Sequence, residues 1–233
     1  MILAISTEKE FRHELKYFVN NSDIWQLKNR LRFVMQKDKN VSQDGRYKIK
    51  SLYFDNVYND ALVEKLDGIS DREKFRIRTY NDDDSFIRLE KKLKHNGLNE
   101  KVSARLTREQ VELIMKGDYD WLKASDNNLL AEFYYNLRVK GLRPKTIVQY
   151  IREPYIYRYG NVRVTIDSDV RTGLNNTDLF DKSILTVPVL ETGKTILEIK
   201  YDEYLPDIIK TITQVGSRER TQASKYAACR IYL

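Results

Sequence analysis

Strict alternation of apolar and polar side chains is the most frequent pattern along the chain. In the segment Arg12–Val19, Glu14 and Lys16 lie on one face and Leu15 and Tyr17 on the other, a period of two that predicts a β-strand. Short polar turns at 81–84 and 95–97 join three consecutive segments of this kind, so we expect an antiparallel meander there. The segments that we predict to be further strands are 47–55, 72–80, 85–94, 99–105, 146–159, 162–169 and 195–202.

Apolar side chains three or four residues apart predict helices between the strands. Ser22 and Asp23 precede the apolar stripe of the first helix, and Thr107 with Gln110 forms a capping box at the start of another. The polar stretch 172–194 carries neither period and is predicted to be irregular. Because no linker or repeat divides the chain, we expect one domain over residues 1–233. The predicted helices are 22–35, 59–66, 107–115, 128–140 and 205–215, followed by a closing segment from Ser224.

The polar faces of the predicted strands are unusually rich in Lys and Arg. A half-exposed antiparallel sheet, apolar toward the core and charged toward water, would explain such a pattern simply. However, solvent faces usually mix Ser, Thr and Asn with charges, and the amphipathic helices need an apolar partner. A sheet closed into a barrel meets both requirements, because its apolar outer face receives the helices and its charged face lines the interior. We therefore predict an α+β fold, an antiparallel β-barrel that forms a polar tunnel with helices packed outside.

Composition narrows the class of protein further. The 233 residues include 41 Lys or Arg and 34 Asp or Glu, a net charge of +7, and 41% are hydrophobic, which favours a folded protein with an anionic partner. One Cys and two His exclude an intramolecular disulfide and a Cys-based zinc cluster. Met1–Glu10 has no basic start for a signal peptide and no stretch reaches the length of a membrane span, so we expect a cytoplasmic protein.

A tunnel lined by about a dozen cations needs anions inside it, since the repulsion would otherwise reach several kcal/mol. Arg forks and Lys ammonium groups match phosphate oxygens. The sequence therefore indicates a linear polyphosphate or a nucleoside triphosphate, with the interleaved carboxylates holding a divalent cation that bridges phosphate oxygens.

An ordered series of short motifs resembles the VTC domain, the polyphosphate polymerase branch of the triphosphate tunnel metalloenzymes, which are related to the CYTH phosphatases. The resemblance covers nearly the whole chain and implies a tunnel that binds ATP, triphosphate or polyphosphate with Mn²⁺ or Mg²⁺. The motifs, in chain order, are RHELKYFV, SLYFDN, KFRIRTY, LEKK, YIRE, VRVTIDSDV, ILEIKY and SKY.

The resemblance also implies roles for individual residues. Glu198 matches the metal-binding glutamate, with Lys200 beside it as a substrate ligand, and Glu14 and Glu90 are auxiliary carboxylates. The basic residues that match phosphate-binding positions are Lys16, Arg76, Arg78, Lys92, Arg152, Arg163 and Lys225, joined by Lys101 and Arg105, where the spacing is looser.

One position departs from the hydrolytic relatives. The CYTH signature Glu-x-Glu-x-Lys has Arg12 in its first place here, which removes a carboxylate and adds a substrate-binding cation. This departure favours polyanion binding over water activation, and hence a polymerase over a phosphatase. The extra domains and membrane spans of the eukaryotic relatives are not in this sequence, so any coupling to a membrane would need a partner.

The leading hypothesis is therefore a metal-dependent phosphotransferase, a polyphosphate polymerase that moves the γ-phosphate of ATP onto a growing chain. Arg76, Arg78, Arg152 and Arg163 would share the transition-state charge, and Lys225 would grip the phosphates together with the other lysines. A triphosphatase or nucleotide cyclase of the same fold is the second hypothesis, and a non-catalytic polyphosphate-binding module is the third. Nucleic acid is not expected as a ligand, because a tunnel excludes duplexes. The oligomeric state stays open.

Three other features receive structural interpretations. His13 faces away from Arg12 and Glu14, which favours a packed histidine over a catalytic one. Cys229 is expected to be a small buried hydrophobe. The stripe formed by Tyr155, Tyr157 and Tyr159 is expected to pack in the barrel shell.

Overall fold

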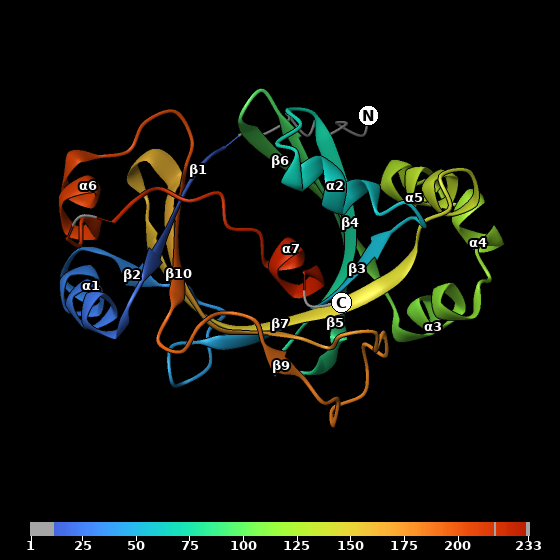
Figure 1. The fold of residues 1–233 in the computed structure, drawn as a ribbon, viewed down its shortest axis with the longest axis horizontal. Coiled ribbons are helices and arrows are strands. Elements are labelled where there is room, and N and C mark those ends of the chain that lie inside the picture. The colour runs from blue at the N-terminus through green and yellow to red at the C-terminus, as the bar shows by residue number, and fades with distance from the viewer. Residues whose placement is uncertain (1–11, 217, 232–233) are drawn as a thin grey trace, which may run out of the picture.

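An antiparallel sheet curls into a barrel-like wall in the computed structural model, which describes residues 12–216 and 218–231 (Figure 1). Its main path has the strand order β1-β10-β8-β7-β3-β4-β5-β6, while β2 pairs with β7 and β9 with β8. The strands are β1 (His13–Val19), β2 (Gln36–Lys37), β3 (Tyr47–Asp55), β4 (Arg72–Tyr80), β5 (Asp83–His95), β6 (Leu98–Leu106), β7 (Arg143–Tyr157), β8 (Val162–Thr172), β9 (Val187–Pro188) and β10 (Thr195–Tyr201).

The two ends of the curled sheet meet at one point. Arg12, just before β1, and Asn99 of β6 form an isolated antiparallel bridge, with N···O distances of 3.0 and 3.2 Å. The predicted antiparallel barrel is thus confirmed as a curled sheet whose seam is joined at this bridge. β3 and β4 have the predicted bounds, whereas β2 and β9, with two residues each, are too short to show a period.

One group of helices covers the outer face of β3 to β6, as the barrel prediction requires. These helices are α3 (Arg108–Lys116), α4 (Asp120–Lys123) and α5 (Asn128–Arg138). Phe133 of α5 lies in the centre of the contact, edge-on to Phe54 at 5.1 Å and stacked on Phe75 at 5.2 Å between ring centroids. The capping box of Thr107 and Gln110 is present. The four-residue helix α4 was not expected from the sequence.

A second group covers the outer face of β8 and β10 on the other side of the barrel (Figure 1). It consists of α1 (Asn21–Val34) and α6 (Asp207–Thr213). α1 begins earlier than predicted, because Asn20 is its N-cap and Asp23 returns the second bond of a capping box. Tyr155 is buried in this cluster as expected, whereas Tyr159 at the end of the stripe is 54% exposed.

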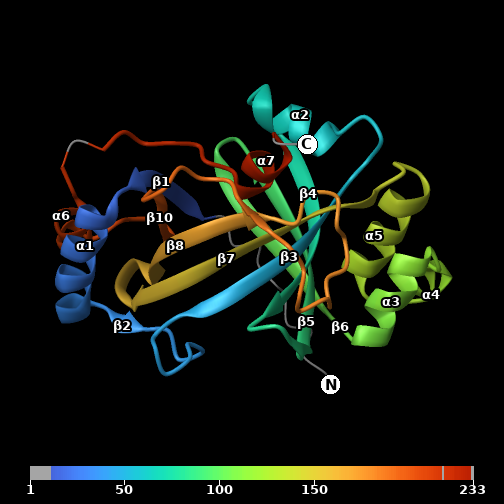
Figure 2. The same cartoon turned by 60° about the horizontal axis from the view of Figure 1, so that its bottom comes forward.

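The last helix, α7 (Lys225–Arg230), lies on the inner face of the sheet and not outside it (Figure 1). Tyr226 and Cys229 pack there with Ile49 of β3 and Val148 of β7, apolar side chains that would otherwise face the cavity. Burial raises the pKa of the Cys229 thiol to about 12, which agrees with its predicted structural role. Figure 2 shows α7 next to α2 (Asp60–Leu66) at one end of the barrel.

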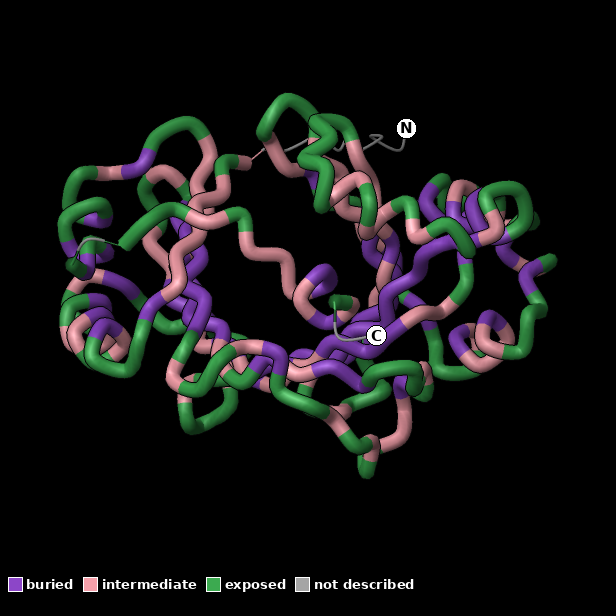
Figure 3. Tube along the Cα trace, in the orientation of Figure 1, coloured by how far each residue is buried: buried purple, intermediate pink, exposed green. Residues whose placement is uncertain are grey.

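Burial follows this architecture. The strands are buried over most of their length and the exposed residues gather on the outer helices and loops (Figure 3). Within 12–216 and 218–231, no helix is both long and apolar enough to cross a membrane. Met1–Glu10, for which no signal peptide is predicted, lies outside the described residues.

One hydrogen bond that joins α7 to β3 should make a measurable contribution to stability. The Tyr226 hydroxyl donates to Asp55 Oδ2 at 2.6 Å, and the same fully buried carboxylate accepts from the backbone N–H groups of Ala61 and Leu62 at the start of α2. Tyr226→Phe should lower the free energy of unfolding by roughly 1–3 kcal/mol, because it leaves a buried carboxylate without one of its donors. Denaturant unfolding measures this loss. Tyr135→Phe, at an exposed tyrosine of α5, is the matched control, and equal stability of the two variants would contradict the prediction.

Candidate functional site

The curled sheet encloses a cavity of about 1670 Å³ whose lining is strongly basic. Sixteen Lys or Arg residues and five Glu residues line it, an excess of eleven positive charges, whereas the whole chain carries a net charge of only +7. The cations are therefore concentrated on the cavity wall, and the rest of the chain is net acidic.

The cavity continues around the open edge of β6. Glu73, Lys91, Glu100 and Glu132 belong to this outer part, since they lie on the outer face of the strands or on α5. The remaining fifteen cations lie on the inner face or at the rim. Within the described residues, Glu14 and Glu198 are the two lining carboxylates on that inner part.

The structure brings twelve of the fourteen predicted site residues to this one cavity. Arg105 and Glu90 are not part of its lining. The twelve residues are Arg12, Glu14, Lys16, Arg76, Arg78, Lys92, Lys101, Arg152, Arg163, Glu198, Lys200 and Lys225.

Arg105 has the parity of the inner face but lies beyond the cavity. The β6 part of the lining ends at Ser103, and the Arg105 guanidinium donates instead to the Ser85 carbonyl at 3.0 Å and lies over the Phe86 ring. Arg105 thus lies outside the cavity lining, because alternation gives the face of a strand and not how far the cavity extends along it.

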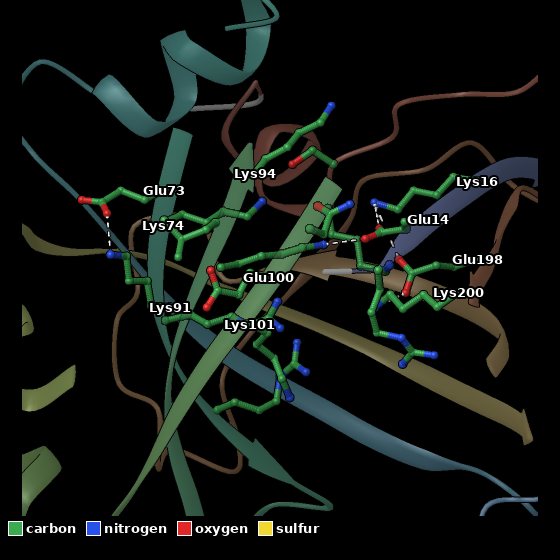
Figure 4. A pocket seen from close by; sticks show the side chains of 18 of the residues that line it. Glu14, Lys16, Glu73, Lys74, Lys91, Lys94, Glu100, Lys101, Glu198 and Lys200 are labelled. Atoms are coloured by element: carbon green, nitrogen blue, oxygen red, sulfur yellow. Dashed lines mark hydrogen bonds and ion pairs between the residues drawn. The ribbon is translucent and has the colours of Figure 1, made fainter. Parts of the chain in front are cut away.

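Two carboxylates and three lysines form a compact cluster where Lys92 of β5 reaches the wall made by β1 and β10. Lys16 Nζ lies 2.5 Å from Glu14 Oε1 and 3.6 Å from Glu198 Oε2. Lys92 reaches Glu14 at 2.8 Å and Lys200 reaches Glu198 at 2.7 Å. Figure 4 shows Glu14, Lys16, Glu198 and Lys200 side by side.

The cluster keeps both carboxylates ionised. Burial and the nearby Glu198 oppose the charge on Glu14, but Lys92, Lys16 and Lys200 outweigh them and hold its pKa well below the ordinary range. Burial likewise opposes the charge on Glu198, yet Lys200, Lys16, Lys225 and Arg152 lower its pKa. Both groups therefore remain anionic at any pH near neutrality.

The arginines of β4 share one buried carboxylate, Glu90. Arg76 donates to it through Nε at 2.8 Å and lies 2.6 Å from it through Nη2, while Arg78 and Lys101 approach at 3.6 and 3.4 Å. The Tyr53 hydroxyl accepts a further bond from Arg76 at 2.7 Å. Glu90 is thus the counter-ion that holds this row of cations, and it is not brought together with the other two predicted carboxylates.

Asp167 has the same role on the opposite wall. It accepts two bonds of 2.6 Å from Arg152, and Lys225 of α7 lies 2.6 Å from its Oδ2, one of the two oxygens that accept from Arg152. The carboxylate is fully buried. The sequence analysis did not include Asp167 in the site, although its alternation with Arg163 in one strand already placed both on the same face.

Arg163 and Arg12 are fixed at the two sides of the cavity. Arg163 donates to Asp38 at 2.7 Å and to the Tyr47 hydroxyl at 2.8 Å. Arg12 pairs with Asp202 at 2.7 Å. His13 beside it is exposed, and one face of its ring stacks on the Tyr201 ring at 5.0 Å between centroids. The predicted packing of His13 is therefore limited to that face of the ring.

Lys74 is a lining residue that the sequence analysis left out of the site. It lies opposite Lys92, which lies opposite Lys101, so three lysines form one row across β4, β5 and β6. Lys74 and Lys101 appear across the cavity from Glu14 and Glu198 in Figure 4. Its position two residues before Arg76 in an alternating strand was the available signal.

Comparison with known proteins identifies the family of the chain. The family description of the VTC domain matches residues 11–233. The chain belongs to the VTC domain family. A search of curated proteins gave no match.

Solved structures show the same fold as this VTC domain at low sequence identity. HpAC1 of Hippeastrum, a candidate adenylyl cyclase with a dominant triphosphatase activity, matches with a TM-score of 0.57 and 14% identity, covering 96% of each chain. A candidate adenylate cyclase of Bacillus halodurans matches with a TM-score of 0.51 and 12% identity, covering 88% of this chain and 86% of the other. At these identities the likeness concerns the fold alone.

The residues of this VTC domain fit a divalent cation in one place. In 12–216 and 218–231, no three Asp, Glu, His or Cys side chains gather closely enough to hold a metal ion by themselves. However, Glu14 Oε1 and Glu198 Oε1 are both buried, and each is in contact with one ammonium group, that of Lys16 at 2.5 Å and that of Lys200 at 2.7 Å, which a divalent ion would have to displace. Two carboxylates suffice for Mg²⁺ or Mn²⁺ when phosphate oxygens and waters complete the coordination, so the fit requires a bound phosphate.

The Lys74 ammonium should make anion binding to this VTC domain pH-dependent. Burial first, and then Lys92, Lys16 and Arg76, lower its pKa well below the ordinary value, against only a partial opposing effect of Glu14. The charge of Lys74 is therefore lost at a lower pH than in an ordinary lysine, and a bound phosphate restores it.

Binding of tripolyphosphate without metal should consequently take up protons and weaken as the pH rises, by at most about tenfold per pH unit for one group. Calorimetry in buffers of different ionisation enthalpy measures the uptake. Lys74→Arg should reduce it, because a guanidinium stays charged throughout. The same uptake in both proteins would contradict the assignment to Lys74.

Proposed function

We propose that this VTC domain is a polyphosphate polymerase, which transfers the γ-phosphate of ATP to the end of a polyphosphate chain held in the cavity. The observation that carries the proposal is the charge of the inner wall. Its fifteen cations face two lining carboxylates, and Glu90, Asp167, Asp38 and Asp202 pair with them from behind. An excess of nine positive charges remains, roughly twice what one triphosphate with about four negative charges neutralises, so the cavity suits a longer polyanion.

The side chains divide into two roles in this proposal. Arg76, Arg78, Arg152 and Arg163 would bind the equatorial oxygens of the γ-phosphoryl group and the developing charge on them. Buried counter-ions and tyrosine hydroxyls fix these guanidinium groups before substrate arrives, so little reorganisation is needed. The lysines, led by Lys16 and Lys225, would hold the non-reacting phosphates.

The reaction needs no nucleophile from the protein. A terminal phosphate oxygen of the acceptor chain attacks the γ-phosphorus, the bond between that phosphorus and the β–γ bridging oxygen breaks, and ADP leaves with the electron pair. A divalent ion bound by Glu14 and Glu198 would supply neutralisation of the charge on the phosphate oxygens. ATP as donor agrees with the cytoplasmic location that we expect for the protein.

Hydrolysis of triphosphate is the second candidate. HpAC1, which shares the fold, has a dominant triphosphatase activity, and a water molecule in place of the acceptor phosphate would give the same bond cleavage. Arg12, in place of a carboxylate, argues against water activation at that position. A binding module without turnover is the third candidate.

Incubation with ATP and Mn²⁺, with and without a short polyphosphate primer, separates these functions by product. A polymerase gives ADP and a ladder of polyphosphate on a denaturing gel. A triphosphatase gives ADP and orthophosphate alone from ATP, or pyrophosphate and orthophosphate from inorganic triphosphate assayed in parallel. Tight polyphosphate binding without either product would leave the binding module. Absence of both binding and turnover would overturn all three.

A further inference from the structure

A small apolar pocket lies beside α7, at the border of the basic cavity. Its volume is about 180 Å³. Most of its lining is aliphatic or aromatic, in contrast to the charged wall next to it. The apolar lining residues are Phe18, Val170, Leu190, Ile196, Ala223, Ala227, Ala228 and Ile231.

The pocket and the cavity adjoin, because they share part of their lining. Gln222, Ser224, Lys225 and Lys65 border both, together with Ala223. Lys225 connects them directly, since its ammonium group lies 2.6 Å from Asp167 on the inner wall. A ligand that crossed this border would have one end among apolar side chains and the other among phosphate-binding cations.

Size and polarity restrict what the pocket can hold. An apolar cavity of about 150 Å³ is known to accept one benzene ring, so this pocket has room for a flat aromatic group. A polyphosphate chain gains nothing from an apolar lining, because its oxygens would lose their hydration there without a partner. These limits favour a flat ring joined to phosphates, with the faces of the ring on the apolar lining and any polar edge turned toward Gln222, Lys65 and Lys225 at the border.

We propose that this pocket holds the base of the nucleoside triphosphate whose phosphates lie in the cavity, an inference that rests on the proposed function. The cavity alone would bind inorganic triphosphate and a nucleotide by the same contacts. The pocket adds contacts that only the nucleotide can make, and it therefore selects the donor substrate.

The pocket recognises a ring and not a particular base. Gln222 is exposed at its rim, and the Ser224 hydroxyl already accepts a bond from the Ala227 N–H at 3.3 Å. With so few groups free to bind base edges, ATP and GTP should bind with similar affinity. Specificity for one base needs several placed donors and acceptors.

Filling the pocket tests the proposal. Ala228 of α7 is half-buried and lines the pocket, so Ala228→Leu should occupy the space of the ring. Phe18→Ala removes the aromatic wall and serves as a second variant if the first is unstable. Each variant should raise the dissociation constant for ATP by about tenfold, while the constant for tripolyphosphate stays within twofold. Ala131→Leu, at an exposed alanine of α5, is the matched control.

The outcomes separate this inference from the proposed function. Loss of ATP affinity alone supports the base pocket. Equal changes in the dissociation constants for ATP and tripolyphosphate, or no change in either variant, overturn the base pocket. The proposed function is unaffected by that result as long as the original protein binds tripolyphosphate. If neither compound binds the original protein, the proposed function itself fails.

Discussion

Replacing Glu198 by Gln should lower phosphoryl transfer by roughly a hundredfold to a thousandfold, the loss typical of removing one well-placed electrostatic group from an active site. The side chain of Glu198 is almost fully buried, with Lys200 at 2.7 Å and Lys16 at 3.6 Å. Its lowered pKa means that it is ionised at neutral pH, so the substitution removes a full negative charge without changing the shape of the side chain. One of the two carboxylates that fit a divalent ion would be lost.

Binding without metal should respond in the opposite direction. The carboxylate of Glu198 repels phosphate and neutralises two lysines, so Glu198→Gln should leave the affinity for tripolyphosphate in EDTA unchanged or increase it. Activity with Mn²⁺ and calorimetric binding in EDTA are the two measurements. Glu153→Gln is the control, because Glu153 also pairs with two lysines, Lys28 and Lys37, but is not part of the cavity lining. Activity within threefold of the original protein would contradict the metal-binding role.

Strand parity, together with the Lys- and Arg-rich strand faces and the need of the amphipathic helices for an apolar partner, predicted the barrel, because a period of two fixes which side chains share a face. Phe75 and Ile77 lie in the outer core while Arg76 and Arg78 line the cavity, as their alternation predicts. Parity carries no information about what lies against a face. The position of α7 on the inner face of the sheet was therefore not predictable, since nothing in the sequence distinguishes its partner Ile49 from the other apolar residues of the strands.

Most of the predicted site residues line the cavity, but the sequence says less about a side chain whose role depends on its partners. Glu90 has the parity of a lining residue, but Arg76, Arg78 and Lys101 surround its carboxylate and withdraw it from the surface of the cavity. The sequence around Glu90 does not show which cations of the neighbouring strands will neutralise it. Asp167 shows the converse case, because its importance comes from Arg152 and Lys225, which lie 15 and 58 residues away in the chain.

Arg76 combines the structural and the proposed catalytic use of a buried cation, and the two can be separated. Arg76→Met should destabilise the fold by roughly 3 kcal/mol, the lower end of the cost of breaking a buried ion pair, because Arg78 at 3.6 Å and Lys101 at 3.4 Å still neutralise Glu90 in part. Phosphoryl transfer should fall by about a hundredfold, since the guanidinium that would bind the transferred phosphoryl group is gone.

The double variant Arg76→Met with Glu90→Gln removes both charges of the pair. Stability should return toward that of the original protein, because no buried carboxylate is left with too few partners, whereas phosphoryl transfer should stay at the level of Arg76→Met alone. Denaturant unfolding and turnover of ATP measure the two quantities on the same samples. Recovery of activity together with stability would show that Arg76 has only a structural role. The variant Arg76→Lys keeps the charge but not the planar fork, so it should have intermediate activity if Arg76 binds the phosphoryl group and full activity if its role is only structural.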